Sequence, residues 1–195
     1  MTTAPPPAAS PFRIVGFGAQ AWNPRTRAPI DPLTEDEARA RHDAGEAYGV
    51  VLTAAPDGLE LPVVGLTVNE HGITVAFHRH DPARSDLVHV WRQDEPGGPY
   101  RIAQVDRRAG NKRQVPRDQL AYEYLKLTVD PAVWVRMTDS GSQVLEERSI
   151  DRDAVAVDPP AFGAYDAYLD PTLSTRLWPG LPELPWVGPD LPVGP

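Results

Sequence analysis

Short apolar runs separated by clusters of turn residues dominate the middle of the chain. Apolar and polar residues alternate within several runs, which is the pattern of a β-strand with one buried face. The connections are short and rich in Pro, Gly, Asn and Asp, so we expect consecutive strands to be antiparallel neighbours. The predicted strands are Phe12–Phe17, Tyr48–Ala54, Leu61–Val68, Ile73–His80, Leu87–Gln93, Tyr100–Val105, Ala132–Met137 and Gln143–Arg148.

Two segments carry helical signals instead. Thr34-Glu35-Asp36-Glu37 has the form of a capping box, in which the Thr34 hydroxyl accepts from the Glu37 amide and Glu37 reaches back to Thr34. We expect a helix over 35–47, with its acids at the positive end of the helix dipole. Leu120, Tyr124 and Leu127 recur at helical spacing and predict a second helix over Pro116–Leu127.

The order of these elements favours the α+β class: a single domain with a mostly antiparallel sheet of about six to eight strands and two helices. Three prolines within 18–33 predict a loop there. The expected divisions are a disordered tail over 1–11, an α+β domain over 12–157 and a Pro/aromatic-rich C-terminal extension over 158–195, packed on the domain. The Pro-x-x-Pro spacing of the C-terminal extension also suits docking to a partner.

Composition narrows the function classes. The net charge of −8 disfavours nucleic-acid binding, because an acidic surface repels phosphates. The absence of cysteine excludes disulfides, thiolate zinc sites and a cysteine nucleophile. No apolar run approaches the ~18–20 residues of a membrane-spanning helix, and the first ten residues lack the pattern of a secretion signal. We therefore expect a cytoplasmic protein, and the Ala/Arg/Pro-rich, Lys-poor composition is typical of GC-rich bacteria.

Histidines gather at one place in the sequence. His78 and His80 lie two residues apart at the end of a predicted strand and therefore share a face, and His89 lies in the next strand. Together they are candidate ligands of a divalent transition metal, because neutral imidazoles suit Zn, Fe or Ni. The strand register decides whether His89 joins the other two. The alternatives are exposed histidines at a strand end, or a histidine that titrates near neutral pH.

The spacing Gly-x5-His-x-His from Gly72 to His80 resembles the first half of the first cupin motif. This resemblance implies a metal-dependent enzyme or small-ligand binder built on a sheet. It covers nine residues. The glutamate that follows in cupins is replaced by Arg84 or Ser85, with Asp86 one position later, and the second cupin motif has no counterpart. The chain is therefore not assigned to that family.

Two charged regions suggest partners. Arg107, Arg108, Lys112 and Arg113 form a basic island, which is either an anion-binding site or a solvated loop. Residues 31–60 hold eight acids and two arginines. Such an acidic face attracts a basic protein, although a charged helix face is often simply solvated.

From these observations we predict a non-catalytic protein-binding domain without a cofactor, and as one concrete form an immunity-type inhibitor of a bacterial toxin domain. Its candidate contacts are Glu35, Asp36 and Glu37, with Trp22, Trp91 and Trp134 as aromatic anchors. The alternative is the metal-dependent, cupin-like enzyme or ligand binder that uses His78, His80 and His89.

Overall fold

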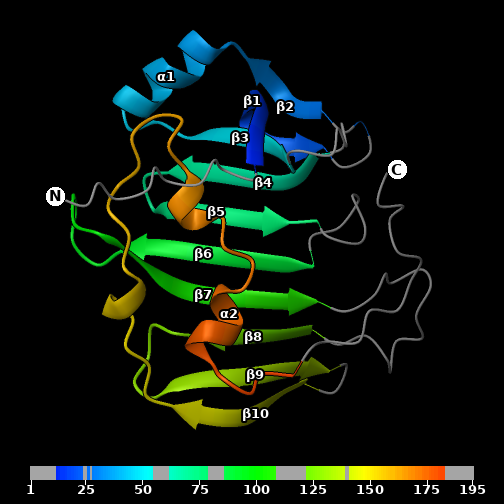
Figure 1. Ribbon diagram of the computed structural model, residues 1–195, viewed down its shortest axis with the longest axis vertical. Coiled ribbons are helices and arrows are strands. Elements are labelled where there is room, and N and C mark those ends of the chain that lie inside the picture. The colour runs from blue at the N-terminus through cyan, green and yellow to red at the C-terminus, as the bar shows by residue number, and fades with distance from the viewer. Residues whose placement is uncertain are drawn as a thin grey trace, which may run out of the picture.

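A single antiparallel sheet of ten strands organises the protein (Figure 1). The computed structural model describes residues 12–23, 26, 28–54, 62–78, 86–108, 122–138 and 141–182. The strand order is β10-β9-β8-β7-β6-β5-β4-β3-β1-β2, so β3 to β10 form a simple meander and β1 lies between β3 and β2. The strands are β1 (Phe12–Asn23), β2 (Ala28–Leu33), β3 (Tyr48–Ala54), β4 (Pro62–Asn69), β5 (Gly72–Phe77), β6 (Leu87–Gln93), β7 (Tyr100–Arg108), β8 (Tyr122–Lys126), β9 (Ala132–Thr138) and β10 (Gly141–Arg148).

The antiparallel sheet is confirmed, but the predicted number of six to eight strands is too low. Residues 18–33 are not one loop: β1 continues to Asn23, and β2 pairs back onto it. The prolines that suggested a loop, Pro29 and Pro32, lie in β2. A proline is tolerated there because β2 is the outermost strand and one of its edges needs no ladder donors.

The predicted helix over Pro116–Leu127 is wrong in its described part, because Tyr122–Lys126 is strand β8. Both the strand period of two residues and the helical period of about 3.6 residues fit this sequence. Glu123 and Leu125 are completely buried on one face, while Tyr122 and Tyr124 are partly exposed on the other. A buried glutamate interrupts the apolar alternation from which a strand is recognised. The helical spacing was therefore the clearer signal in the sequence, and it predicted a helix. Residues 116–121 lie outside the described part of the chain.

The ladder register builds one continuous apolar face. Val75 pairs with Leu66 on one side and with His89 on the other, and the same row continues to neighbouring strands. Six residues of this row have no exposed surface: Val50, Leu66, Val75, His89, Val105 and Leu125. We call the side of the sheet that carries this row the covered face, because the core lies on it.

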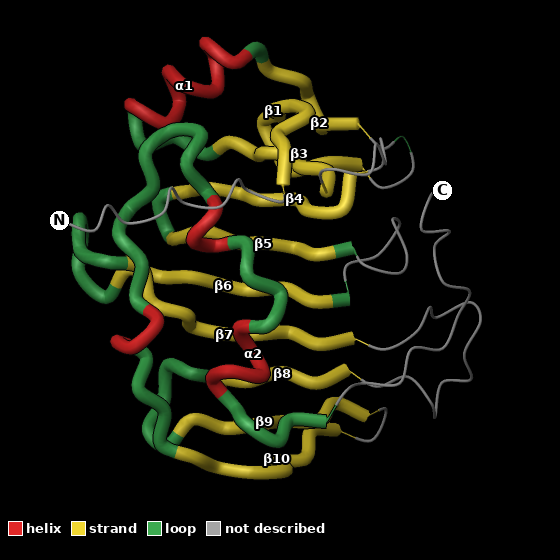
Figure 2. Tube along the Cα trace, viewed as in Figure 1, coloured by secondary structure: helices red, strands yellow, loops and turns green. Residues whose placement is uncertain are grey.

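The segment that follows β10 covers this face. It runs along the sheet from β10 toward α1 (Glu35–Asp43), turns back, and descends through the 3-10 turn η3 (Asp166–Tyr168) and helix α2 (Leu173–Leu177) toward β9 (Figure 2). Tyr168 meets Trp91 edge-on, and Trp178 meets Trp134 in the same manner. The large buried side chains that it contributes are Tyr165, Tyr168, Leu169, Leu173, Leu177, Trp178 and Leu181.

Arginine side chains tie the end of this segment to the sheet. Arg148 donates to the Pro179 carbonyl at 3.1 Å, and Arg107 donates to the Pro182 carbonyl. Trp178 donates to a Glu146 carboxylate oxygen at 3.1 Å. The chain up to Pro182 is thus held on the covered face by polar bonds as well as by apolar packing.

Candidate functional site

The first turn of α1 presents the three predicted acids, and they differ in what they bind. The capping box is confirmed: the Glu37 amide donates to Thr34 Oγ1 at 3.2 Å, and the Thr34 amide donates to Glu37 Oε2 at 2.8 Å. Hydrogen bonds donated to the Glu37 carboxylate by the Thr34 amide and then by the Thr34 hydroxyl lower the pKa of Glu37 below its usual value. Ala38 is the buried residue of the helix, so the acidic side of α1 faces solvent. Glu37 is therefore committed to capping the helix.

Glu35 and Asp36 stand on the same turn in different situations. Glu35 accepts from Arg39 Nη2 at 2.8 Å, and both side chains are well exposed. Asp36 is exposed as well, and among the described residues no hydrogen bond or ion pair engages its carboxylate. Asp36 is the acid of this turn that a partner's cation reaches without breaking a bond inside the protein.

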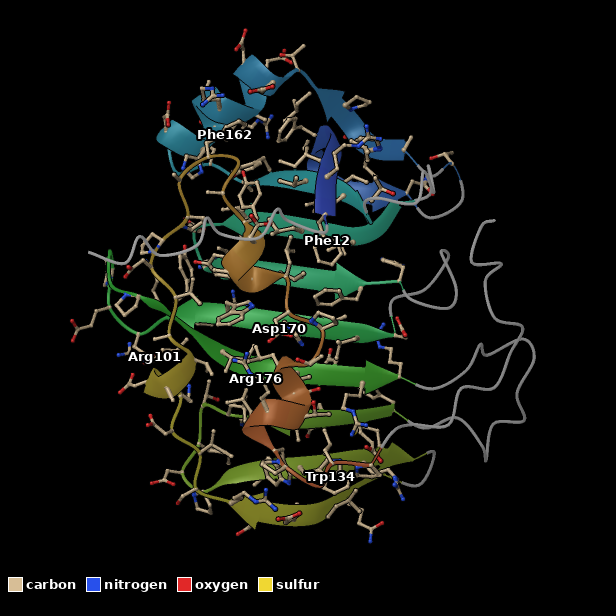
Figure 3. The ribbon with its side chains drawn as sticks, in the orientation of Figure 1. Phe12, Arg101, Trp134, Phe162, Asp170 and Arg176 are labelled. Carbon is tan, nitrogen blue, oxygen red and sulfur yellow. The ribbon has the colours of Figure 1, made fainter. Side chains whose placement is uncertain are left out.

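An open groove lies beside this acidic turn. Its volume is about 410 Å³, and Phe17 and Phe162 stack in its wall with ring centroids 5.4 Å apart. The Arg39 guanidinium lies 4.4 Å from the centroid of the Phe162 ring. Figure 3 shows Phe162 beside α1. The lining comes from β1, α1 and the turn after residue 160: Ile14, Val15, Gly16, Phe17, Glu35, Arg39, Phe162 and Gly163. Apolar surface and an acidic turn are thus combined in one place.

A chain of polar side chains supports the groove from within the core. The Tyr48 hydroxyl lies 2.9 Å from His42 Nδ1 and 2.9 Å from the Tyr165 hydroxyl, so it links α1, β3 and the segment that follows β10. Burial, and then the hydrogen bond with Tyr165, raise the pKa of Tyr48 far above its usual value. Phe162 packs edge-on against His42. These contacts fix the position of Phe162 in the groove.

No pattern in the sequence marks Phe162 as a groove residue. It lies in the C-terminal extension, far along the chain from Phe17, Arg39 and Val15, and the fold brings all four together. Val15 is 45% exposed, which is visible only in the structure. Of the predicted aromatic anchors, Trp91 is 1% exposed and lies in the core, and Trp134 is partly buried against it. Trp22 lies in β1, but its side chain is outside the described part.

The predicted histidine cluster is divided by the register. His89 pairs with Val75 and lies on the covered face, where its ring meets Phe77 edge-on at 5.2 Å. Strand alternation groups His78 with Thr74 and Ala76, which lie on the opposite side. His78 and His89 are both buried, and His80 lies outside the described residues. Within the described ranges, no three His, Asp or Glu side chains are grouped as a metal site requires.

The basic island is likewise divided. Arg107 is buried and pairs with Glu123, whose carboxylate also accepts from Arg136 at 2.7 Å and from Trp134 Nε1 at 3.1 Å. Arg108 lies near Asp106 and over the Tyr122 ring. Lys112 and Arg113 fall outside the described residues. Arg107 therefore belongs to a buried ion cluster, and its guanidinium is not presented to a solvent anion.

A second depression, of about 550 Å³, lies between the β6–β7 hairpin and the chain after β10. Its two arginines are already engaged: Arg101 bonds Asp153 and lies 3.6 Å from Asp94, and Arg152 lies 3.4 Å from Asp94 and donates to the Ile102 carbonyl at 2.9 Å. These bonds hold the 3-10 turn η2 (Asp153–Val155) against β7. The residues of this depression therefore serve to attach η2 to β7, and the groove beside α1 is the stronger candidate for binding a partner.

Comparison with known proteins identifies no relative: no family model, curated protein or solved structure matches the chain. In the described part of the chain, the helices are too short or too polar to cross a membrane. The candidate function therefore rests on the surface of this molecule alone.

Proposed function

We propose that this chain is a non-catalytic protein-binding domain that recognises a basic protein through the acidic turn of α1 and the groove beside it. The observation that carries the proposal is the exposed, unengaged Asp36 carboxylate, which follows Glu35 in the turn that lines an open groove together with Phe17 and Phe162. Interfaces of this type combine a charged rim, which accelerates association, with a central aromatic contact, which supplies most of the affinity. A bacterial immunity protein that covers a toxin domain is one concrete form of such a binder.

The charge pattern around the groove supports a cationic partner. Between Asp31 and Glu46 the chain carries six carboxylates against two arginines. One of the arginines, Arg39, is already neutralised by Glu35 and covers the Phe162 ring. This stretch by itself therefore carries a net charge of −4, which favours the approach of Lys- and Arg-rich surfaces.

Affinity capture from a native bacterial extract tests this proposal. Asp36→Lys reverses the charge at the proposed site, and Glu147→Lys is the matched charge-reversal control. Both positions are exposed carboxylates, but Glu147 lies in β10 at the far end of the sheet. We expect a basic protein to be retained by the wild type and by Glu147→Lys, and its association rate with Asp36→Lys to fall by about 2- to 10-fold at low salt. Recovery of monomer alone at every salt concentration would contradict the proposal.

The metal-dependent alternative stays a prediction that rests on His78, His80 and His89. Metal analysis of the purified protein decides it, together with thermal melting in the presence of Zn, Fe, Ni or Mn. A stoichiometric metal, or a clear upward shift of the melting temperature, would support it over the binding proposal.

A further inference from the structure

The free edge of β1 indicates how a partner docks at the groove. We propose that the partner inserts an extended, basic segment that pairs as an additional strand with the outer edge of Arg13–Gly16 and places an apolar side chain in the groove. This inference rests on the proposed function and specifies the form of the partner. Addition of a strand to an open sheet edge is a known mode of peptide recognition, with backbone bonds for affinity and pockets for specificity.

The edge exists because β1 is longer than its neighbour β2. On one side β1 pairs with β3 from Phe12 to Gly18. On the other side β2 begins to pair only at Phe17, opposite Leu33, because the chain then leaves the sheet to enter α1. Among the described residues, Arg13–Gly16 has no backbone hydrogen bonds to any segment other than β3. A short length of strand is therefore open beside the groove.

The other two edges of the sheet are protected and this one is not. β2 carries Pro29 and Pro32, which remove ladder donors. β10 carries the charged run Glu146-Glu147-Arg148, and the Arg148 guanidinium lies over Trp178. Such prolines and charges are the usual protection against unwanted strand pairing. Arg13 is the one charged residue of the proposed edge, and Ile14-Val15-Gly16 contains neither proline nor charge, so this stretch is the edge best suited to accept a strand.

The side chains around the edge define the chemistry of the inserted segment. Ile14 to Phe17 line the groove together with Phe162, so an apolar side chain of the new strand finds an apolar wall. A bulge in β1 leaves Val15 opposite no β3 residue, with its side chain 45% exposed at the rim. Strand residues alternate in direction, so the neighbours of the inserted residue point away from the groove. These outward positions hold the Lys or Arg residues of the basic partner, which the acids of α1 attract. The fitting segment alternates apolar and basic residues.

The probe is the synthetic peptide Lys-Val-Lys-Val-Lys-Val-Lys, titrated into the full chain and followed by amide NMR. We expect slowed hydrogen exchange at one or more amides of Arg13–Gly16 and shifts at Phe162. Two variants of this peptide, called the methylated twins, carry backbone N-methyl groups. In one twin they are on the valines, and in the other they are on the lysines. Because successive amides of a strand point to opposite edges, one twin should lose binding by at least about tenfold while the other keeps it.

Protein variants check the location of the peptide. Val15→Lys places a charge on the proposed edge, and Val144→Lys is its match, because Val144 is 53% exposed on the opposite outer strand. We expect at least a tenfold loss of peptide affinity for the first variant and little change for the second. Should Val15→Lys fail to fold, the methylated twins still decide, since they leave the protein unchanged.

Several outcomes would overturn the inference, and they are distinguishable from failure of the proposed function. Equal binding of both methylated twins would show that no strand is added. If Asp36→Lys still weakened peptide binding, the acidic turn of α1 would remain supported as a binding surface. Some amides of Arg13–Gly16 point away from β3, and their protection before the peptide is added would show that another part of the chain, or in a dimer a second copy, already occupies the edge. No NMR change at millimolar peptide would also refute strand addition, while the proposed function would still be judged by capture of a basic protein.

Discussion

Glu123 offers the sharpest test of how the buried ion cluster stabilises the sheet beneath the segment that follows β10. Its carboxylate is completely buried and lies 3.3 Å from Arg107 Nη1, 2.7 Å from Arg136 Nη2 and 3.1 Å from Trp134 Nε1. Glu123→Gln keeps the size of the side chain and removes its charge. The substitution therefore isolates the electrostatic role of Glu123 within the ion cluster.

The expected loss follows from the burial of its two partners. The Arg107 side chain is 9% exposed and retains a charge that water barely reaches after the substitution, whereas the Arg136 side chain is 43% exposed and is hydrated. Removal of one member of a buried ion pair typically costs about 3–5 kcal/mol, because the remaining charge stays desolvated. That is a large part of the roughly 5–15 kcal/mol by which a typical domain is stable. Arg136→Gln leaves the buried Arg107 still paired with Glu123, so we expect it to cost only roughly 1.5–3 kcal/mol.

Urea unfolding at pH 7, followed by tryptophan fluorescence, measures these free energies of unfolding. Equal slopes against urea for wild type and variants would show that the comparison is one of stability alone. The double variant Arg107→Met with Glu123→Leu should recover part of the loss, since apolar residues of similar size often replace a buried pair without cost. A loss below about 1 kcal/mol for Glu123→Gln, within the range of ordinary substitutions, would refute the reasoning. So would a loss no larger than that of Arg136→Gln.

Three further predictions concern stability. Thr34→Ala removes the cap of α1 and should cost about 1 kcal/mol in urea unfolding, and an unchanged midpoint would contradict the cap's role. Hydrogen bonds, from Trp178 first and then from an arginine, lower the pKa of Glu146, so its contribution is present above pH 4.5 and is lost as pH falls through the lowered pKa. Glu146→Gln should therefore flatten the acid limb of thermal stability against pH, and a limb as steep as that of the wild type would argue against it. The pKa of Tyr48 is raised, so its contribution is complete below pH 10 and is lost at higher pH. Tyr48→Phe should weaken the alkaline decline, and an unchanged decline would exclude Tyr48 as its source.

Local sequence signals predicted much of the sheet. Tyr48–Ala54 and Leu87–Gln93 have the same bounds in the sequence prediction and in the structure, because both runs are β-branched and apolar and are followed by turn residues. The capping box likewise specified the start of α1. In these places the local preference and the tertiary environment agree, so the sequence is sufficient.

The misses have tertiary causes. β2 is a strand despite its prolines because it lies at the edge of the sheet, and its position in the sheet is not written in its own residues. β8 is a strand despite its helical spacing because Glu123 is neutralised by arginines from β7 and β9. Neither condition is visible until neighbouring strands are in place.

The sequence by itself determined an acidic, cysteine-free chain with a largely antiparallel sheet and a capped acidic helix, because alternation, turn residues and caps act over a few neighbouring residues. Only the tertiary structure decided the register that places His89 in the core, away from the side of Thr74 and Ala76. It alone also brought Phe162 beside Phe17 and left the edge of β1 open next to α1. These features depend on contacts between residues that are distant in the chain, and such contacts follow from the packing of the whole sheet.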